Sequence, residues 1–347
     1  MLLLLLKKPF NGEKVSLQTL EQERFVREEE ARAKSDGTPV AFRWDGLKKL
    51  GADRTLPLPV SFSWELTREP KETEIYYHLL ISESRDMKKP WLYITKDRFF
   101  DVYNLKVGTE YFWCVQINGK RSEVFSFKTL LSLPRCLKID TVPNVRDMGG
   151  YTVTGGRIRQ GLLYRGSELE SHTVLTPSGA EELSRLEIKT EVDMRGESIG
   201  VVEATTAECL GVKRIFIPSV PYTEVFDEKH RTALGKLYRA FASPKNYPLY
   251  FHCWGGADRT GTVAFILGAF LGMSYEDLIY DYEFTSLSVW GPRSRNYFEF
   301  RRFVLQLTSL AGESLSEKAA TFLKDRAGLT DKQLLAIYDT LVEKTDV

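Results

Sequence analysis

The sequence has 347 residues, of which 43% are hydrophobic and 27% charged, and its formal net charge is +1. These values are ordinary for a globular protein and exclude the basic excess of a typical nucleic-acid or membrane-surface binder, so we expect no nucleic acid as a partner. At roughly 100–200 residues per domain, the length predicts two domains.

The N-terminal leucine run and the cysteines bear on the compartment. Residues 2–6 are five leucines, fewer than the roughly 7–15 apolar residues of a signal core, and two lysines follow them instead of preceding them. Four cysteines are too few and too scattered to predict a disulfide framework. We therefore expect a cytoplasmic protein, with secretion as the open alternative. The longest apolar run, 262–273, is shorter than the roughly 20 residues of a membrane span, so none is predicted.

Residues 1–37 are predicted to be a charged lead-in segment. From residue 13 to 36 the sequence is rich in Glu, Arg, Lys and Gln, and Leu17, Leu20 and Phe25 are too sparse to form a full buried stripe. We expect an exposed helix with a solvated face.

Residues 38–130 alternate with a period of two, which is typical of strands with one buried face. Val60, Phe62 and Trp64 alternate with serines, and no helical period separates the candidate strands. Several short strands of this kind predict an all-β sandwich domain. The candidate strands are 60–64, Ile75–Ser82, Trp91–Thr95, Phe99–Val102, Tyr111–Ile117 and Glu123–Thr129.

The segment Leu105–Val115, together with the upstream Trp64, resembles a fibronectin type III or similar immunoglobulin-like module. The resemblance covers about 90 residues. It implies either a docking domain, with a protein or a carbohydrate as candidate ligand, or a structural cap on the second domain.

Residues 131–143 contain two prolines and no amphipathic period, and they are predicted to be a linker. In residues 144–347 strands and helices alternate, which predicts an α/β domain with a central sheet flanked by helices. Thr176-Pro177, Ser274 and Thr330 are predicted helix starts. The expected elements before the tail are strands Leu162–Arg165, Thr190–Met194, Arg214–Ile217 and Leu249–Cys253 and a helix near Lys229–Ala242.

The segment His252–Gly261 carries the predicted chemistry. An apolar strand ends at Cys253, and Arg259 follows six positions later at the start of a helix. A helix N-terminus and a guanidinium both lower a thiol pKa, so Cys253 is predicted to be a thiolate nucleophile. His252, on the opposite face of the strand, is expected to hold the loop by hydrogen bonding.

The residues between Cys253 and Arg259 suit a phosphate-binding loop. Successive backbone N–H groups at a helix start bind phosphate oxygens, and glycine accepts the dihedrals that aim them inward. Arg259 can clamp two phosphate oxygens, and Thr260 can donate its hydroxyl to the sulfur. No metal or other cofactor is expected. The predicted cradle comprises Trp254, Gly255, Gly256, Ala257 and Arg259.

The pattern His-Cys-x5-Arg-Thr-Gly resembles the phosphate-binding loop of protein tyrosine phosphatases. Three further segments narrow the resemblance to the bacterial tyrosine phosphatase family, whose members include mycobacterial secreted phosphatases active on phosphotyrosine, phosphoserine and phosphoinositides. The resemblance implies a single α/β phosphatase domain and a two-step mechanism through phosphocysteine. The segments are Asn144–Tyr151 (Asn-Val-Arg-Asp-Met-Gly-Gly-Tyr), Gly161–Ser167 and Val192–Arg195.

The family resemblance also suggests the general acid. Members of this family, like myotubularin lipid phosphatases, carry an aspartate directly before the loop arginine, and here that residue is Asp258. We predict that Asp258 protonates the leaving oxygen and later activates water, although it could instead only shape the loop. Asp227 is the second candidate, because it follows a strand and a Pro-containing loop that could close over a substrate.

Substrate class is predicted from two positions in the loop. Relatives that act on phosphoinositides commonly have a lysine where this chain has Ala257, which weakens the case for highly charged lipids. Trp254 can form an aromatic wall for a phosphotyrosine ring or pack against the neighbouring helix. The supporting ion-pair residues are predicted to be Asp147, Arg165, Asp193 and Arg195.

The leading functional prediction is therefore a protein tyrosine phosphatase that acts on a phosphotyrosine-containing protein or a small phosphate ester. Hydrolysis of an inositol phosphate or phosphoinositide is the alternative, and a phosphate-recognition module without turnover is the second alternative. A sulfurtransferase of the rhodanese type would lack the Arg-Thr helix start.

Overall fold

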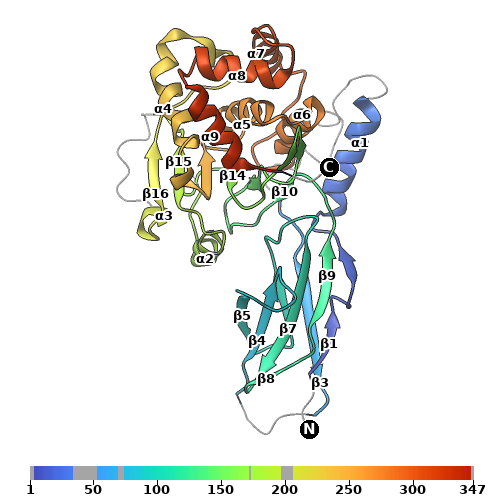
Figure 1. Ribbon diagram of the computed structural model, residues 1–347. Helices are drawn as coiled ribbons and strands as arrows, with labels where there is room; N and C mark the ends of the chain where they lie inside the picture. Colours follow the sequence, from blue (N-terminus) through green and yellow to red (C-terminus); the bar gives the residue numbers. More distant parts are fainter. Residues whose placement is uncertain (1–3, 34–52, 69–73, 172, 197–205, 345–347) are drawn as a thin grey trace. The chain divides into compact units, whose positions relative to one another are not determined.

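The computed structural model describes residues 4–33, 53–68, 74–171, 173–196 and 206–344. The chain forms two compact units (Figure 1). Unit 1 comprises Met1–Thr19 and Pro57–Leu133, and unit 2 comprises Leu20–Leu56 and Pro134–Val347. The two units therefore alternate along the sequence, and each is made of two separate segments.

Unit 1 is built from two sheets, and its described residues contain no helix. One sheet has the order β1-β3-β6, and the other has the order β2-β9-β7-β4-β5, with β8 paired to β7. All pairs are antiparallel except β2 with β9. The strands are β1 (Leu4–Lys8), β2 (Glu13–Val15), β3 (Val60–Leu66), β4 (Tyr77–Ser82), β5 (Trp91–Thr95), β6 (Phe99–Val102), β7 (Glu110–Ile117), β8 (Lys120–Arg121) and β9 (Phe125–Thr129).

One hydrophobic core joins the two sheets of unit 1. The alternate residues Val60, Phe62 and Trp64 of β3 are buried in the same cluster as Tyr111 and Trp113 of β7. The rings of Phe62 and Trp113 meet edge to face with centroids 5.0 Å apart, although their strands belong to different sheets. The period-two pattern of the sequence thus corresponds to the inward faces of these strands.

The N-terminal segment differs from the predicted charged lead-in of residues 1–37. β1 pairs with β3 and β2 with β9, so the leucine run contributes an edge strand to unit 1. The predicted helix lies at α1 (Leu20–Ala33), within unit 2, and Phe25 is buried against Phe284 with ring centroids 5.9 Å apart. One large aromatic residue, Phe25, packs the first part of this helix into the core. A search for a repeated apolar stripe does not detect a single buried residue of this kind.

The predicted linker 131–143 also differs. From Pro134 onward it belongs to unit 2, where β10 (Arg135–Cys136) pairs with β11 (Arg146–Asp147). Leu137, Ile139 and Val142 are buried in a core cluster of this unit. They occupy irregular backbone, so neither a helical nor a strand period marks them in the sequence.

Unit 2 contains the predicted α/β sheet, with the order β10-β11-β14-β17-β15-β16. The four strands from β14 to β16 run parallel, and β10 and β11 form an antiparallel edge. A small separate sheet joins β12, β13 and β18. These strands are β12 (Thr152–Val153), β13 (Gly156–Ile158), β14 (Leu163–Gly166), β15 (Thr190–Asp193), β16 (Lys213–Phe216), β17 (Leu249–His252) and β18 (Val342–Glu343).

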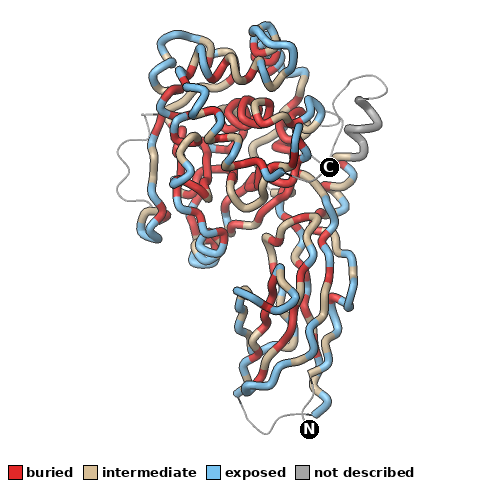
Figure 2. Tube along the Cα trace, in the orientation of Figure 1, coloured by how far each residue is buried: buried red, intermediate tan, exposed pale blue. Residues whose placement is uncertain are grey.

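Helices cover both faces of this sheet. The helices α2 and α3 belong to the face on which Tyr164 and Tyr250 are buried, because both tyrosines share a core cluster with Leu183 and Ala207. On the other face α5 contacts β14 and β17, and most of its residues are buried (Figure 2). The helices are α2 (Pro177–Arg185), α3 (Thr206–Cys209), α4 (Arg231–Phe241), α5 (Asp258–Leu271), α6 (Tyr275–Phe284), α7 (Phe298–Thr308), α8 (Leu315–Asp325) and α9 (Asp331–Leu341).

The predicted helix starts have capping contacts. The hydroxyls of Thr176, Ser274 and Thr330 each accept a hydrogen bond from a backbone N–H three residues later, and Thr330 forms a capping box with Gln333. Short 3-10 helices connect the longer elements: η4 (Tyr222–Phe226), η5 (Glu228–His230), η6 (Pro244–Asn246) and η7 (Thr285–Leu287).

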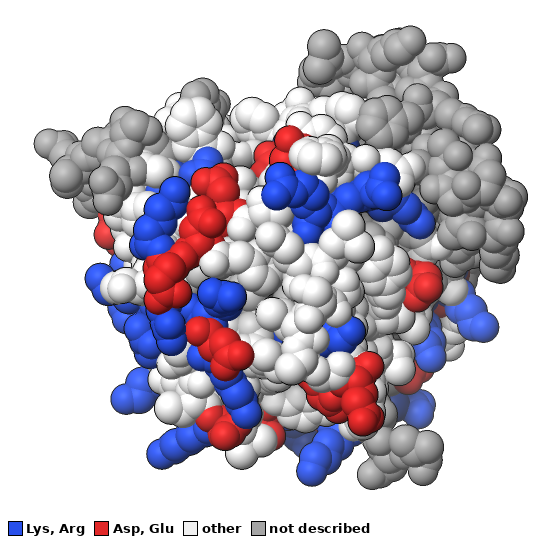
Figure 3. All heavy atoms as spheres, turned by 90° about the horizontal axis from the view of Figure 1, so that it is seen from above, with Lys and Arg blue, Asp and Glu red and all other residues white. Residues whose placement is uncertain are grey.

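Two surface properties agree with the composition. No helix in the described ranges combines the length and the apolar character that a membrane span requires. On the face of the molecule drawn in Figure 3, side chains of both charge signs are intermixed around a largely uncharged area, in keeping with the net charge of +1.

Candidate active site

The candidate site lies at the carboxyl end of β17, an inner strand of the parallel sheet. β17 pairs with β14 on one side and β15 on the other, and the chain passes from His252 through residues 253–257 into α5. The carboxyl end of a parallel sheet next to a helix N-terminus is a common place for anion binding in α/β proteins.

Cys253 follows β17 directly and is 4% exposed. Burial by itself would raise the pKa of its thiol, but the charge of Arg259 and the nearby hydroxyl and N–H groups of Thr260 outweigh burial, so the pKa lies below its ordinary value. The buried Thr260 hydroxyl forms no hydrogen bond of standard geometry with another described residue. It can therefore turn toward the sulfur.

The five carbonyl groups of the loop point away from its centre. Each accepts a hydrogen bond from a group outside the loop or from the following helix. The donors to the carbonyls of residues 253 to 257 are, in order, the His252 ring (2.8 Å), the Glu168 N–H (2.9 Å), the Asn144 side-chain amide (3.0 Å), the Arg165 guanidinium (2.8 Å) and the Gly261 N–H (2.8 Å).

The N–H groups of the loop have the opposite environment. Within the described ranges, the main-chain N–H groups of Gly255, Gly256 and Ala257 donate to no acceptor. A buried N–H without a partner is costly, so such groups are normally satisfied by a ligand or by water. Three such donors beside a thiol of lowered pKa suit an anion with several oxygens.

The two glycines are required for different reasons. Gly256 has φ +64°, and a Cβ there would lie 2.3 Å from the Gly166 carbonyl oxygen. At Gly255 the constraint is packing, because a Cβ would lie 2.7 Å from the ring of Trp290. Only Gly256 therefore has the left-handed dihedral that the sequence analysis expected of both.

A buried arginine–aspartate network supports the loop through side chains that bond its carbonyl groups. Asp281 pairs with Arg146 at 2.6 Å and with Arg165, and all three side chains are at most 7% exposed. Arg146 in turn donates to the Asn144 side-chain oxygen at 2.6 Å. The two side chains that bond the Gly255 and Gly256 carbonyls, Asn144 and Arg165, are thus fixed by one carboxylate.

The other predicted cradle residues lie around the same loop. Arg259 is half-buried and donates to the Met194 carbonyl at 3.2 Å. Trp254 is 39% exposed, so part of its ring faces solvent. Ala257 is buried immediately before α5 and brings no charge.

Asp258 is the first residue of α5, and both of its carboxylate oxygens are bonded. Arg293 donates from Nε to one oxygen at 2.7 Å and from Nη2 to the other at 2.8 Å. The Tyr222 hydroxyl donates to the first oxygen as well. The Asp258 side chain is 38% exposed. Oδ1 accepts from two of these donors and Oδ2 from one, so a proton would occupy the remaining lone pair of Oδ2 or displace a donor.

The structure gives Asp227, the second acid candidate, a different environment. It lies between η4 and η5, its side chain is 53% exposed, and it forms an ion pair with Lys229 at 3.6 Å. No contact among the described residues joins its side chain to the loop after Cys253.

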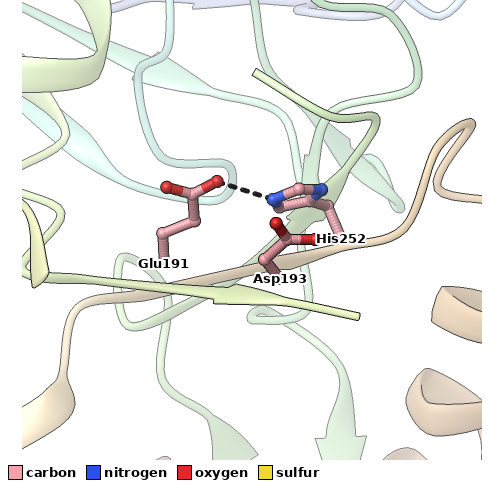
Figure 4. A group of neighbouring side chains, drawn as sticks. All are labelled: Glu191, Asp193 and His252. Carbon is pink, nitrogen blue, oxygen red and sulfur yellow. Dashed lines mark hydrogen bonds and ion pairs between the residues drawn. The ribbon is translucent and has the colours of Figure 1, made fainter. Parts of the chain in front are cut away.

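His252 lies between two acceptors. Its Nε2 is 2.7 Å from Glu191 Oε1 (Figure 4). Its Nδ1 is 2.8 Å from the Cys253 carbonyl oxygen. Burial would lower the pKa of the ring, but the Glu191 carboxylate outweighs burial and the pKa is raised. The raised pKa favours the imidazolium, the form that can donate from both nitrogens at once.

The group Glu191, Asp193 and His252 also has the composition of a metal site, with ligand atoms within 4.8 Å of one another (Figure 4). Both Asp193 oxygens, however, already accept hydrogen bonds from Arg195, and Arg214 bonds one of them at 2.6 Å. A metal ion would have to displace these cations, so the group fits a charge-balanced support better than a metal centre.

The remaining predicted support residues lie in buried ion pairs. Arg195 pairs with Asp193 at 2.8 Å and with Glu168 at 3.0 Å, and all three side chains are fully buried. Asp147 pairs with Arg135 and accepts from the Gly149 and Gly161 N–H groups at 2.8 and 2.6 Å. Burial raises the pKa of Asp147 despite the neighbouring guanidinium.

The chain was compared with known proteins. The model of a family described as the tyrosine phosphatase family matches residues 137–343, more than half of the sequence. The chain belongs to this family. A Cupriavidus necator protein whose name provisionally assigns it as a tyrosine-protein phosphatase is 30% identical over 172 residues, covering 42% of this chain. The chain spans only 61% of the length of that relative.

Solved structures show weaker similarity. The core catalytic domain of the PP-IP phosphatase Siw14 from S. cerevisiae is 15% identical, with a TM-score of 0.29 over 47% of this chain and 82% of that one. A fibronectin type III domain derived from the human KIAA0970 protein is 25% identical, with a TM-score of 0.19 over 24% of this chain and 74% of that one.

Five residues near the loop of this tyrosine phosphatase family member were not predicted from the sequence. Asn144 and Arg146 lie within the segment 144–151 that carries the family resemblance, so the resemblance was a signal for them. Asp281, Arg293 and Tyr222 lie outside the segments that carry the resemblance, and no local spacing marks them.

Proposed function

We propose that the protein hydrolyses phosphate monoesters through a phosphocysteine intermediate on Cys253, with phosphotyrosine in a protein or a small phosphate ester as substrate. The observation that carries this proposal is the orientation of the loop. Its carbonyls are bonded outward, while the N–H groups of residues 255–257 donate to no acceptor in the described ranges and directly follow a thiol of lowered pKa and its neighbour in the chain. That arrangement matches a tetrahedral anion next to a nucleophile.

In the first step the Cys253 thiolate attacks phosphorus, and an S–P bond forms as the bond to the leaving oxygen breaks. The Arg259 guanidinium binds two of the phosphoryl oxygens, and the loop N–H groups bind the negative charge that the transition state spreads over them. Asp258 gives its proton to the leaving oxygen. This assignment is supported by its position at the start of α5, one residue before Arg259.

In the second step water attacks phosphorus and the S–P bond breaks. Asp258, now a carboxylate, accepts a proton from the water, and the Thr260 hydroxyl donates to the sulfur as it leaves as a thiolate. The Thr260 hydroxyl suits this role because it is buried and forms no standard hydrogen bond among the described residues. The products are phosphate, the alcohol or phenol, and the original thiolate.

Two residues favour a phenolic substrate over a highly charged one. Trp254 exposes part of its ring next to Cys253, where it can stack on a phenyl group. Ala257 supplies no cation for the further phosphates of an inositol compound.

The proposal is tested by measuring vanadate-sensitive hydrolysis of a phosphotyrosine peptide, a phosphoserine peptide, an inositol phosphate and a phosphoinositide. Cys253→Ser is expected to lower turnover by roughly 10⁴-fold or more, the scale of losing a nucleophile. Cys209→Ser, which removes an exposed free thiol, is the matched control and should retain full activity. Full activity in Cys253→Ser would refute the proposal.

The same panel separates the alternatives. Turnover of the inositol substrates far above that of the phosphotyrosine peptide would favour the inositol phosphate or phosphoinositide function. Phosphate or vanadate binding without turnover of any substrate would favour a recognition module.

We also propose that unit 1 is an immunoglobulin-like sandwich of the fibronectin type III kind. Support comes from Tyr111 near the start of β7, whose hydroxyl accepts from the Lys106 N–H at 2.8 Å. A tyrosine that bonds back to the backbone a few residues upstream is a hallmark of such sandwiches. Docking of a protein or carbohydrate remains its proposed role.

A further inference from the structure

We infer that Arg293 is a positioning residue that acts through Asp258 by fixing the direction of its carboxylate. The inference rests on the proposed function, because it concerns the acid of that reaction. It assigns a role to a residue that lies 34 positions beyond the loop arginine in sequence.

The contacts of Arg293 hold its guanidinium on both sides. Nε and Nη2 form a two-point contact with the Asp258 carboxylate, at 2.7 and 2.8 Å. Nη1 donates to the carbonyls of Trp290 and Pro292, at 3.3 and 3.0 Å. A planar fork anchored this way specifies the plane of the carboxylate as well as its position.

The segment that carries Arg293 is itself attached to the phosphate loop. Trp290 packs on Gly255 so closely that a Cβ on the glycine would lie 2.7 Å from the indole. The indole Nε1 donates to the Ser167 hydroxyl at 2.8 Å. Movement of this segment would therefore disturb Asp258 and the cradle together.

Tyr222 supplies a second, independent sign that Asp258 is held in place. It has φ +53°, a conformation that a bulky side chain rarely adopts. Its N–H donates to the Thr262 hydroxyl at 2.9 Å, and its own hydroxyl donates to Asp258. Strained residues of this kind persist where the surroundings require them, often at functional sites.

The charged and titratable groups that face Asp258 come from four elements. Arg293 and the Tyr222 hydroxyl contact it, the Tyr282 hydroxyl lies 2.8 Å behind that of Tyr222, and the Cys253 thiolate lies across the loop. Arg293 contributes two charge-assisted hydrogen bonds, which fix the plane of the carboxylate. Without them the Asp258 side chain would lose its fixed direction.

The test is a double-mutant cycle of Arg293→Met with Asp258→Asn, measured on the full chain. Two substrates are used: a phosphotyrosine peptide, whose leaving group needs an acid, and 2,4-dinitrophenyl phosphate, whose leaving group does not. A positioned acid contributes roughly 10²–10⁴-fold, so we expect Arg293→Met to lower kcat on the peptide at least about tenfold, with a much smaller loss on the activated ester.

One further readout completes the expected result. In the Asp258→Asn background, Arg293→Met should change kcat by less than about twofold, because residues that act as a unit are not additive. An equal loss in both backgrounds would overturn the inference.

The matched control is Arg295→Met, which removes an arginine from the same segment. Arg295 contacts Glu283, at 3.0 and 2.7 Å, instead of Asp258. It should leave the ratio of kcat on the two substrates unchanged, even if it lowers stability. A change of this ratio as large as that in Arg293→Met would also count against the inference.

Two outcomes separate this inference from the proposed function. If Cys253→Ser keeps its activity, the proposed function itself fails. If Cys253→Ser is inactive but Arg293→Met and Asp258→Asn are simply additive, only the role of Arg293 fails. If Arg293→Met does not fold, two other variants replace it in the same cycle. Arg293→Lys keeps the charge but loses the two-point contact with Asp258, and Tyr222→Phe removes the third hydrogen-bond donor to that carboxylate.

Discussion

Two arginine–aspartate clusters flank the phosphate loop, and they differ in burial and in what they hold. The cluster of Asp281 with Arg146 and Arg165 is almost completely buried, and its side chains lead to the loop carbonyls. In the cluster of Asp258 with Arg293, the two side chains are 38% and 19% exposed, and the carboxylate lies at the start of α5.

The difference in burial indicates that the two clusters have different roles. Around Asp281 every charge is paired in a setting where an unpaired charge would be expensive, so this cluster can only shape the loop. Solvent reaches the partly exposed Asp258 carboxylate, so this group can exchange a proton without leaving a fully buried charge unpaired. Variants of the first cluster should alter stability and phosphate affinity, and variants of the second should alter kcat on substrates whose leaving group needs an acid.

The largest effect is expected for Asp281→Ala. It leaves Arg146 and Arg165 buried without their shared carboxylate, and breaking a buried pair in this way costs about 3–5 kcal/mol. Urea denaturation should show this loss in the free energy of unfolding. Glu276→Ala, which removes an exposed acid from the same helix, is the control and should cost less than about 1 kcal/mol. Equal losses in the two variants would show that the Asp281 cluster is not a structural support.

A smaller effect is expected for Asn144→Gly. Asn144 has φ +62°, which glycine accepts, so the substitution removes the amide that bonds the Gly255 carbonyl without adding backbone strain. Loss of the bond to the Gly255 carbonyl, about 1–2 kcal/mol, should weaken vanadate inhibition roughly tenfold. The substitution also removes the acceptor of the Arg146 contact at 2.6 Å, so stability should fall as well. Asn118→Gly, the same change at a left-handed residue of unit 1, should leave the inhibition constant unchanged. An unchanged constant in Asn144→Gly would mean that the carbonyl contact does not shape the cradle.

The smallest effect is expected for Thr260→Val, measured by the rate of Cys253 alkylation against pH. The wild-type midpoint should lie below the ordinary thiol value of 9.0. Removing the hydroxyl withdraws a donor that stabilises the thiolate, so the pKa rises and the midpoint moves to higher pH, by about one unit or less. Cys136, whose pKa burial raises to about 12, should stay unmodified in both proteins. A midpoint that does not move would mean that Arg259 and the helix N-terminus lower the pKa of Cys253 without help from the Thr260 hydroxyl.

The two clusters also show what the sequence could and could not predict. Cys253, Arg259 and Thr260 lie within eight residues of one another, and their mutual geometry follows from a strand that ends where a helix begins. The spacing of these three residues along the sequence was therefore enough to predict this part of the site. Asp281 and Arg293 are brought to the loop by the packing of later elements, and no period or spacing encodes such distant pairs.

The same distinction applies to the fold. The strands of residues 60–129 and the capped helix starts were predictable because alternation and capping are local patterns. The allocation of residues 20–56 and 134–143 to unit 2 depends on contacts such as Phe25 with Phe284, which join positions more than 250 residues apart. A composition change along the chain cannot reveal two units whose segments alternate in this way.

The central claim is that Cys253 carries the phosphoryl group during turnover. The most direct test is to quench the reaction of a ³²P-labelled phosphotyrosine peptide within a single turnover, digest the protein and locate the label by peptide mass spectrometry. The account predicts an acid-stable but iodine-sensitive phosphothioester on the peptide that contains Cys253, and none in Cys253→Ser. Release of labelled phosphate with no labelled Cys253 peptide at any quench time would contradict it.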